Sequence, residues 1–449
     1  MCRVLAVTAL VALGALGCSG ATDSATPTPE RPNILIILTD DQPAQPETYR
    51  VMPQTMRLFR TGGTRYKNAV ATTPLCCPSR ASIFSGRYAH NHGVRDNDSA
   101  TAFDATKSIQ AVLQGSGYQT GLVGKYLNLI TDDPPHFDHW ATFADGIGGY
   151  KDPIFNVNGN VVETSLYSTT FIRRKALSFL GAFEQDDSAP WFLEIAPFSP
   201  HTPATPERRY ADVRVPGWQT NPAREEKDLS DKPAFIRALT RDDPMKTKRL
   251  RNMQLRSLMS VDDLVDQVFS RLQERGEARN TLAFFMSDNG YFWYEHRVPY
   301  GKFLPYDEAV KIPFFARWPG NLAMSTVEQK IVANIDVAPT IYDAAGVAPD
   351  YVVDGQSIFR SQRSEIFLEF LFNPRQPQYP KWHSLWTPDS SYIRYYESEG
   401  KPGEYYGPND PWQLENRYRD GISGNEPIDE AELDARLQQH SSCVGVECP

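Results

Sequence analysis

Residues 33–41 read Asn-Ile-Leu-Ile-Ile-Leu-Thr-Asp-Asp, an apolar run that ends abruptly in two carboxylates. Near-continuous apolar runs of this length are typical of strands that are covered on both faces, as in parallel sheets. Runs of the same form lie at residues 119–124, 191–196 and 281–286. This repeated pattern predicts an α/β fold with a mainly parallel central sheet and helices on both faces.

Polar and charged side chains follow each of these four strands. They are Asp40 and Asp41, then Lys125, then His201, then Asp288 and Asn289. In parallel sheets, ligands bind beyond the carboxyl ends of the strands. We therefore expect these side chains to meet at one edge of the sheet.

The rest of the chain predicts helices and a second domain. Apolar residues at helical spacing predict a helix from about 245 to 274 that stops at Gly276. Residues 213–243, rich in proline and charge, are interpreted as a surface loop or as an element that selects the substrate. The composition changes near residue 360, which predicts a main domain over 33–360 and a smaller C-terminal α+β domain over 361–449.

The N-terminus predicts export. Residues 1–18 combine an early arginine, an apolar run too short to span roughly 30 Å of hydrocarbon, and small residues, as signal peptides do. Cys18 follows Ala-Leu-Gly, which resembles a bacterial lipoprotein cleavage box; simple secretion and an uncleaved anchor are the alternatives. Residues 19–32 have the composition of a flexible tether. The expected location is the cell surface, the periplasm or the medium.

Charge and cysteine usage narrow the classes of function. A formal net charge of −9 argues against nucleic acid as a partner, but it does not exclude an anionic substrate at a local cationic site. Cys443 and Cys448 are close enough to close a small disulfide loop. A bridge between the adjacent Cys76 and Cys77 would be strained, so that pair needs another explanation.

Residues 75–80, Leu-Cys-Cys-Pro-Ser-Arg, contain the signature Cys-x-Pro-Ser-Arg of the formylglycine-dependent sulfatases. The chain resembles this family, which belongs to the alkaline-phosphatase-like superfamily, over nearly its whole mature length. The resemblance implies a catalytic domain over 33–360 that hydrolyses sulfate monoesters of a sulfated sugar or an aryl alcohol. The register selects Cys76, because Cys77 has proline directly after it.

The resemblance also implies the cofactors. A formylglycine-generating enzyme would act on the chain as a partner and oxidise Cys76 to formylglycine, whose hydrate attacks sulfur. The second hydroxyl of the hydrate would then expel sulfate by collapse to the aldehyde. The implied metal is Ca²⁺, bound by residue 76 and by the oxygen donors Asp40, Asp41, Asp288 and Asn289.

Further catalytic roles follow from the same resemblance. Asp288 would accept the proton of the attacking hydroxyl. Arg80 would hold the hydrate, Lys125 and Lys302 would bind sulfate oxygens, and His201 would face the leaving oxygen. His296, upstream of Lys302, matches a histidine of many bacterial relatives at stretched spacing, whereas Asp336 is interpreted as structural.

One departure from the family pattern concerns residue 127. Many sulfatases have histidine there, whereas this chain has Leu127, which leaves open the group that deprotonates the second hydroxyl. Residues 125–128, Lys-Tyr-Leu-Asn, resemble glucosamine-6-sulfatases, so Asn128 is a candidate substrate-binding residue. His90 and His92 either line the site or are structural.

Two alternatives remain at this stage. A phosphonate or phosphodiester hydrolase of the same superfamily would share the fold and the nucleophile. An inactive sugar-binding surface protein would share the fold alone, but the complete set of charged residues argues against a decayed site.

Overall fold

The computed structural model describes residues 31–449, apart from 186–187, 239–242, 372–376, 397–402 and 419–428. The predicted signal, Cys18 and most of the predicted tether lie outside the described residues, so they stay predictions. Within the described part, no helix combines the length and the apolar character that a membrane crossing requires.

Ten described strands form one large sheet. They are β1 (Asn33–Thr39), β2 (Thr64–Val70), β3 (Gln119–Gly124), β4 (His139–Phe143), β5 (Ile154–Val157), β6 (Asn160–Glu163), β7 (Trp191–Ala196), β8 (Thr281–Ser287), β9 (Phe314–Arg317) and β10 (Thr326–Ala333). Their order is β10-β2-β9-β8-β1-β7-β3-β4-β5-β6. The four strands expected from apolar runs, β8, β1, β7 and β3, are adjacent and mutually parallel. Strand β9 runs antiparallel to both of its neighbours, and the hairpin β5–β6 closes the other edge. The prediction of a mainly parallel sheet is confirmed.

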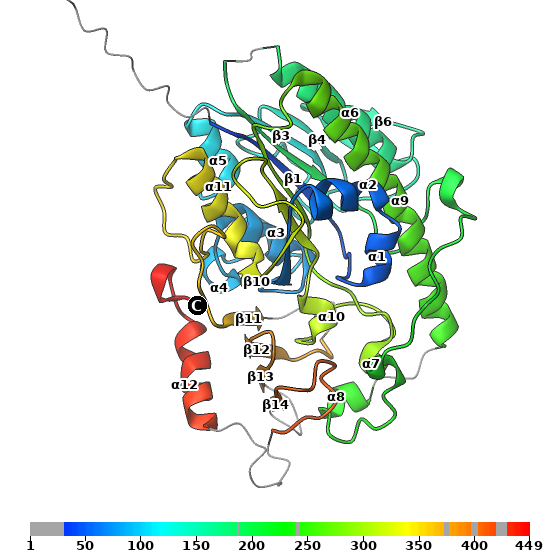
Figure 1. Ribbon diagram of the computed structural model, residues 1–449, viewed down its shortest axis with the longest axis vertical. Helices are drawn as coiled ribbons and strands as arrows, with labels where there is room; N and C mark the ends of the chain where they lie inside the picture. The colour runs from blue at the N-terminus through cyan, green and yellow to red at the C-terminus, as the bar shows by residue number, and fades with distance from the viewer. Residues whose placement is uncertain (1–30, 186–187, 239–242, 372–376, 397–402, 419–428) are drawn as a thin grey trace, which may run out of the picture. The chain divides into compact units, whose positions relative to one another are not determined.

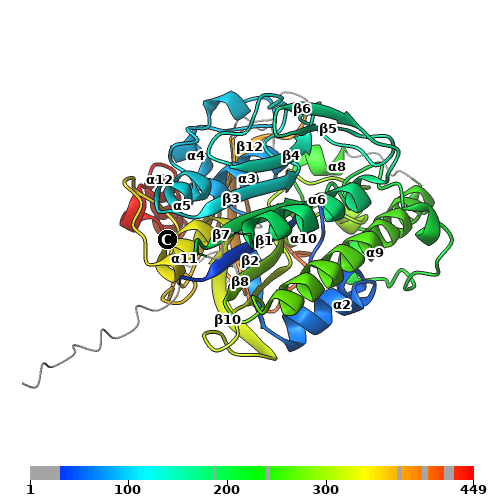
Figure 2. The same cartoon turned by 90° about the horizontal axis from the view of Figure 1, so that it is seen from above.

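Helices cover both faces of this sheet (Figures 1 and 2). The described helices are α1 (Pro46–Arg50), α2 (Pro53–Thr55), α3 (Cys76–Ser85), α4 (Ala89–His92), α5 (Ile109–Gly115), α6 (Ser168–Phe183), α7 (Pro222–Glu225), α8 (Ala234–Arg237), α9 (Pro244–Arg275), α10 (Asp307–Val310), α11 (Val337–Ala345) and α12 (Glu430–His440). Because side chains alternate along a strand, Leu35 and Ile37 pack with α6 and α9, whereas Ile34 and Ile36 pack with α3, α5 and α11.

The long predicted helix is confirmed as α9. Pro244 opens it, and Gly276 ends it with a left-handed φ of 86°, a conformation that glycine adopts without steric cost. The stretch before it, predicted as a surface loop or a substrate-selecting element, carries the short helices α7 and α8 between turns.

The C-terminal part forms a second, antiparallel sheet, which confirms the predicted α+β character. Strands β11 (Ile366–Phe370), β12 (Lys381–Trp386), β13 (Ser391–Tyr396) and β14 (Gly403–Tyr406) pair in this order, and α12 packs near β12. Side chains join this sheet to the main domain: Trp382 Nε1 donates to Phe303 O at 2.7 Å, and Tyr306 Oη donates to Glu404 Oε1 at 2.9 Å. The boundary at residue 360 stays a prediction.

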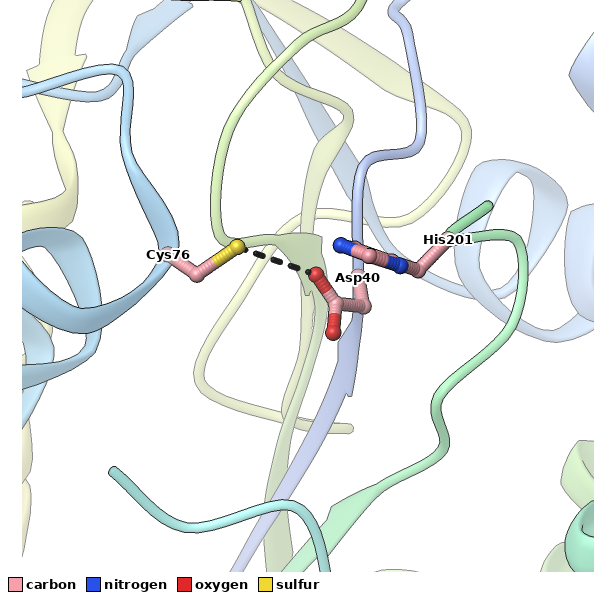
Figure 3. Close-up of side chains that lie close together, drawn as sticks. All are labelled: Asp40, Cys76 and His201. Atoms are coloured by element: carbon pink, nitrogen blue, oxygen red, sulfur yellow. Dashed lines mark hydrogen bonds between the residues drawn. The ribbon is translucent and has the colours of Figure 1, made fainter. Parts of the chain in front are cut away.

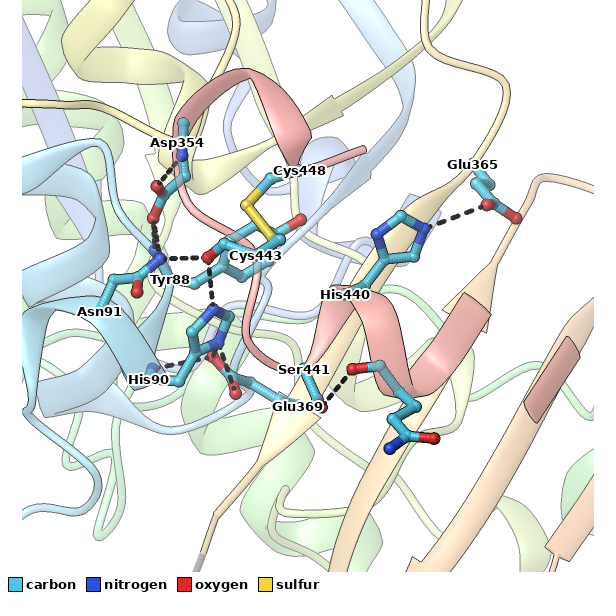
Figure 4. The surroundings of a disulfide bond; sticks show 12 residues. Tyr88, His90, Asn91, Asp354, Glu365, Glu369, His440, Ser441, Cys443 and Cys448 are labelled. Atoms are coloured by element: carbon cyan, nitrogen blue, oxygen red, sulfur yellow. Dashed lines mark hydrogen bonds and ion pairs between the residues drawn. A yellow bond between two sulfur atoms is a disulfide. The ribbon is translucent and has the colours of Figure 1, made fainter. Parts of the chain in front are cut away.

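Cys443 and Cys448 form a disulfide whose loop contacts the main domain (Figure 4). His90 Nε2 and Asn91 Nδ2 both donate to Cys443 O, at 3.1 and 2.8 Å. Asp354 accepts from the backbone N–H of Gly445 at 2.8 Å and from Asn91 Nδ2 at 2.8 Å. The chain end is therefore attached to the segment that follows α3.

Gly124 connects β3 to Lys125 and has no room for a side chain. Its φ is +111°, and an added Cβ would lie 2.1 Å from Ala196 O. We predict that Gly124→Ala lowers the free energy of unfolding, measured by urea denaturation, by more than about 2 kcal/mol. Gly181→Ala is the matched control, because that glycine lies inside α6 with open space around it, and alanine there should add about 0.5–1 kcal/mol. Equal stability of the two variants would contradict this account.

Candidate active site

The carboxyl ends of β1 and β8 bring four oxygen donors together. Asp40 and Asp41 follow β1, Asp288 and Asn289 follow β8, and all four side chains are buried. The backbone N–H of Asp41 donates to Asp288 Oδ1 at 3.1 Å, and Asn289 Nδ2 donates to Asp41 Oδ1 at 2.7 Å. The predicted meeting of these strand ends is thus what the structure shows.

Helix α3 supplies the next two residues. Cys76 is its first residue and Arg80 lies one turn later, so both side chains face the strand ends. Cys76 Sγ lies 3.4 Å from Asp40 Oδ1 (Figure 3). Arg80 Nε donates to Asp288 Oδ2 at 2.9 Å, and Arg80 Nη1 donates to Lys125 O at 3.0 Å.

Two buried lysines complete a cationic lining. Lys125 Nζ donates to Asp40 Oδ2 at 2.6 Å. Lys302 Nζ donates to Asp41 Oδ1 and lies 2.7 Å from Cys76 Sγ. With Arg80, three cations therefore surround the three carboxylates and the cysteine.

The two acidic strand ends differ in proton affinity. Burial raises the pKa of Asp40, but Lys125, His201, Arg80 and Lys302 outweigh burial and hold that pKa well below its usual range. For Asp288, burial followed by the negative charge of Asp40 raises the pKa to about 6. Of these two carboxylates, Asp288 is accordingly the one better suited to accept a proton.

The site has the donor set of a metal centre. Carboxylate oxygens of Asp40, Asp41 and Asp288 lie within 4.8 Å of one another. Oδ1 of Asn289 is buried and has no hydrogen-bond partner among the described residues. A buried acceptor without a donor is costly, and a cation at this position would satisfy it. These residues could therefore hold a metal ion.

His201 lies on the other side of Asp40 from Cys76 (Figure 3). Its side chain is 26% exposed, and Nε2 lies 3.7 Å from Asp41 Oδ2. Nδ1 contacts Thr202 O at 2.7 Å, and because a carbonyl oxygen only accepts, Nδ1 carries a hydrogen. Nε2 is thus the ring nitrogen that faces the site.

Comparisons with known proteins agree with this geometry. A family model described as Sulfatase matches residues 32–347, more than half of the chain. The chain belongs to the sulfatase family. A second family model, described as N-sulphoglucosamine sulphohydrolase, C-terminal, matches residues 293–442.

Individual relatives cover different shares of this sulfatase. The extracellular sulfatase SULF-1 homolog of Drosophila melanogaster is 34% identical, over 75% of this chain and 32% of that protein. The N-acetylglucosamine-6-sulfatase of Homo sapiens is 29% identical, over 79% of this chain and 70% of that protein. The chain spans between 32% and 57% of the length of three curated relatives that it matches.

The fold agrees with solved structures. A protein solved in complex with its substrate D-glucosamine-2-N,6-O-disulfate has a TM-score of 0.75 at 23% identity, over 91% of this chain and 96% of that chain. This likeness confirms the alkaline-phosphatase-like fold of the sulfatase.

The structure places His296 in a different cluster. Its Nδ1 lies 2.7 Å from Glu226 Oε2, its Nε2 lies 3.7 Å from Glu308 Oε2, and its ring stacks on Tyr306 at 4.4 Å. These contacts are with the loop that carries α7 and with α10, rather than with Cys76 or the strand-end carboxylates. Its catalytic role stays a prediction.

Other residues singled out in the sequence have structural partners. His92 Nε2 lies 3.0 Å from Ser82 Oγ, and His90 contacts Glu369 and Cys443, which favours the structural alternative for both. Asp336 forms an ion pair with Arg363 at 2.8 Å, as expected of a structural residue. Asn128 is buried, with no hydrogen-bond partner for Oδ1 among the described residues, and its role in substrate binding stays a prediction.

Sequence reasoning overlooked the residues that position α3. Ser79 Oγ donates to Asp288 O, and Asn334 Nδ2 donates to Ser79 Oγ at 2.9 Å.

A second overlooked residue positions the segment of His201. Tyr150 Oη donates to His201 O, at the other side of the site. Ser79 lay inside the quoted motif, but lone asparagine and tyrosine residues far along the chain carry no sequence signal of such roles.

Proposed function

We propose that this protein hydrolyses sulfate monoesters, with a sulfated amino sugar as its substrate. The observation that carries the proposal is the position of Cys76, which is buried among three carboxylates and three cations at the ends of the central strands. Arg80, Lys125 and Lys302 supply the positive charge that a sulfate group and its transition state require.

Residue 76 suits conversion to formylglycine. Burial, followed by the charge of Asp40, raises the pKa of the Cys76 thiol well above its usual value, so the unmodified side chain would be a protonated and weak nucleophile. A hydrated formylglycine at this position would supply a hydroxyl nucleophile instead. Asp288 would accept the proton of that hydroxyl, and Arg80 and Lys302 would orient the group.

Calcium is the metal that these donors suit best. Asp40, Asp41, Asp288 and Asn289 offer oxygen alone, which is the preference of a hard cation such as Ca²⁺. When bound, the ion would act as a Lewis acid toward the sulfate ester. Lys125 and Lys302 would hold sulfate oxygens, each beside one of the carboxylates.

His201 is proposed as the acid that protonates the departing alcohol, and because Nδ1 already carries a hydrogen, it would act as an imidazolium ion that gives up the proton on Nε2. Its Nδ1 is held by Thr202 O, which aims Nε2 at the site. A sugar alkoxide is a poor leaving group and needs a proton in the transition state.

The nature of the alcohol and the location of the protein are inferred from relatives. One structural neighbour was solved with a sulfated glucosamine as its substrate, and two relatives are named as an extracellular sulfatase and an N-acetylglucosamine-6-sulfatase. With Leu127 in place of histidine and the buried Asn128 three residues after Lys125, we infer a similar sulfated sugar, with Asn128 among its contacts. Export, a lipid anchor at Cys18 and maturation by a formylglycine-generating enzyme belong to the same proposal.

Activity on a panel of sulfated sugars, aryl sulfates and phosphonates tests the proposal. Protein made together with a maturating enzyme should hydrolyse sulfated sugars best, and peptide mass spectrometry should find the aldehyde at residue 76. Cys77→Ala is the matched control and should keep most activity, because Cys77 packs in the hydrophobic core, whereas Cys76→Ala should be inactive. Full activity with an unmodified Cys76 would contradict the formylglycine mechanism. A preference for phosphonates would favour a phosphonate or phosphodiester hydrolase instead.

The donor set predicts the metal response. Chelation should abolish activity and lower the melting temperature, and Ca²⁺ should restore both better than Zn²⁺, because the four protein donors include no histidine or thiolate. Asp40→Ala should lose the response of the melting temperature to added Ca²⁺. Best recovery with zinc or manganese would instead support the phosphonate hydrolase.

The role of His201 predicts a dependence on the leaving group. Nitrophenolate leaves well without a proton, so His201→Ala should lose ~10²–10⁴-fold more activity on a sulfated sugar than on nitrophenyl sulfate. Lys302→Ala is measured with the same two substrates. If the bias appears in Lys302→Ala and not in His201→Ala, then Lys302 is the acid and the assignment to His201 is wrong.

A further inference from the structure

A carboxylic acid occupies a core position of the central sheet. Glu194 is the fourth residue of β7, and its register neighbours are Ile36 on β1 and Leu122 on β3. These two side chains, with Phe192 and Ala196 of the same strand, belong to the apolar layer between the sheet and α3, α5 and α11. Glu194 is fully buried, so its carboxyl group lies in that apolar layer.

Few polar groups surround this carboxyl group. Neither oxygen of Glu194 has a hydrogen-bond partner among the described residues. The positive charge of Arg80, from α3, lowers the pKa of this carboxyl group. Tyr126, which follows β3, is a titratable neighbour of Glu194. Cys77 of α3 and the uncharged, fully buried Gln110 of α5 lie near Tyr126.

These surroundings favour the neutral form of the acid. An ionised carboxylate that is buried without donors is strongly disfavoured, and a single cation that is already shared with other carboxylates offsets only part of this cost. Arg80 is shared in this way, since its Nε is bound to Asp288 and its Nη2 lies 3.7 Å from Asp40. Burial accordingly raises the pKa of Glu194 from 4.5 to about 8, against the opposing effect of Arg80.

We propose that Glu194 makes the active site sensitive to pH: its carboxyl group is neutral in the active protein, and its ionisation lowers activity through its attraction for Arg80. An ionised Glu194 would attract the guanidinium group, whose Nη2 has no hydrogen-bond partner among the described residues. That attraction would weaken the hold of Arg80 on Asp288 and on residue 76. The expected effect on activity rests on the proposed function, whereas the expected effect on stability does not.

The first test is the dependence of kcat/KM on pH between 6 and 10. The wild-type protein should lose about tenfold per pH unit above a midpoint near 8. Glu194→Gln and Glu194→Met should match the wild-type rate at pH 7 within about twofold and lack this loss. Tyr126→Phe, a buried neighbour outside the catalytic groups, is the control and should keep the wild-type profile. A wild-type profile in either folded Glu194 variant, or an inactive folded Glu194→Gln at pH 7, overturns the proposal.

The second test measures stability without any substrate. Because the pKa of Glu194 is higher in the folded than in the unfolded protein, the stabilisation from its proton is complete below pH 4.5 and is lost as the pH rises through 8. The urea midpoint of the wild type should therefore fall between pH 5 and 9 relative to that of Glu194→Met, which removes a buried polar group and should fold. A constant difference between the two proteins overturns the proposal, whereas the expected fall without activity on any sulfate ester would count against the proposed function alone.

Discussion

Charge compensation among six buried side chains is the constraint on which this structure depends. Asp40, Asp41 and Asp288 end two adjacent strands, and Arg80, Lys125 and Lys302 reach them from three other segments. An uncompensated buried charge costs several kcal/mol, so none of these side chains is stable in its place without the others. The segments that carry the six residues are thereby fixed relative to one another. The same ion pairs stabilise the carboxyl-terminal edge of the central sheet and form the candidate active site.

Helix α3 depends on this constraint most directly. All ten of its residues are buried, which is unusual for a helix that carries an arginine. Its burial is possible because Arg80 pairs with Asp288, and because Ser79 bonds Asp288 O on one side and Asn334 on the other. Cys76, the proposed nucleophile position, therefore sits on a helix that is held at both its charged and its neutral polar groups, an arrangement that would keep residue 76 oriented for reaction.

The sequence predicted the parts of the fold whose signals are local. The strands β1, β3, β7 and β8 are near-continuous apolar runs, and parallel pairing then places their polar ends at one edge. Strand β9, with four residues, and the exposed hairpin β5–β6 lack such runs, so the antiparallel pieces were not predicted. The contacts of His296 could not be predicted from the sequence either. Tyr294, His296 and Arg297 have positive φ values that turn this loop. The spacing between His296 and Lys302 does not reveal where the ring points after such a turn.

The C-terminal sheet completes the site rather than only following it. Lys302 reaches Cys76 from a loop in which Gly301 and Phe303 both have positive φ, a conformation that the loop is not expected to keep by itself. Gly301 O accepts from the backbone N–H of Phe292 at 2.9 Å, and Phe303 O accepts from Trp382 Nε1 of β12. The ring of Phe303 also stacks on Tyr379 at 5.5 Å. Phe292 of the main domain therefore holds one side of Lys302 and Trp382 of the antiparallel sheet holds the other, so this sheet contributes to the position of one of the three cations and to the charge balance around residue 76.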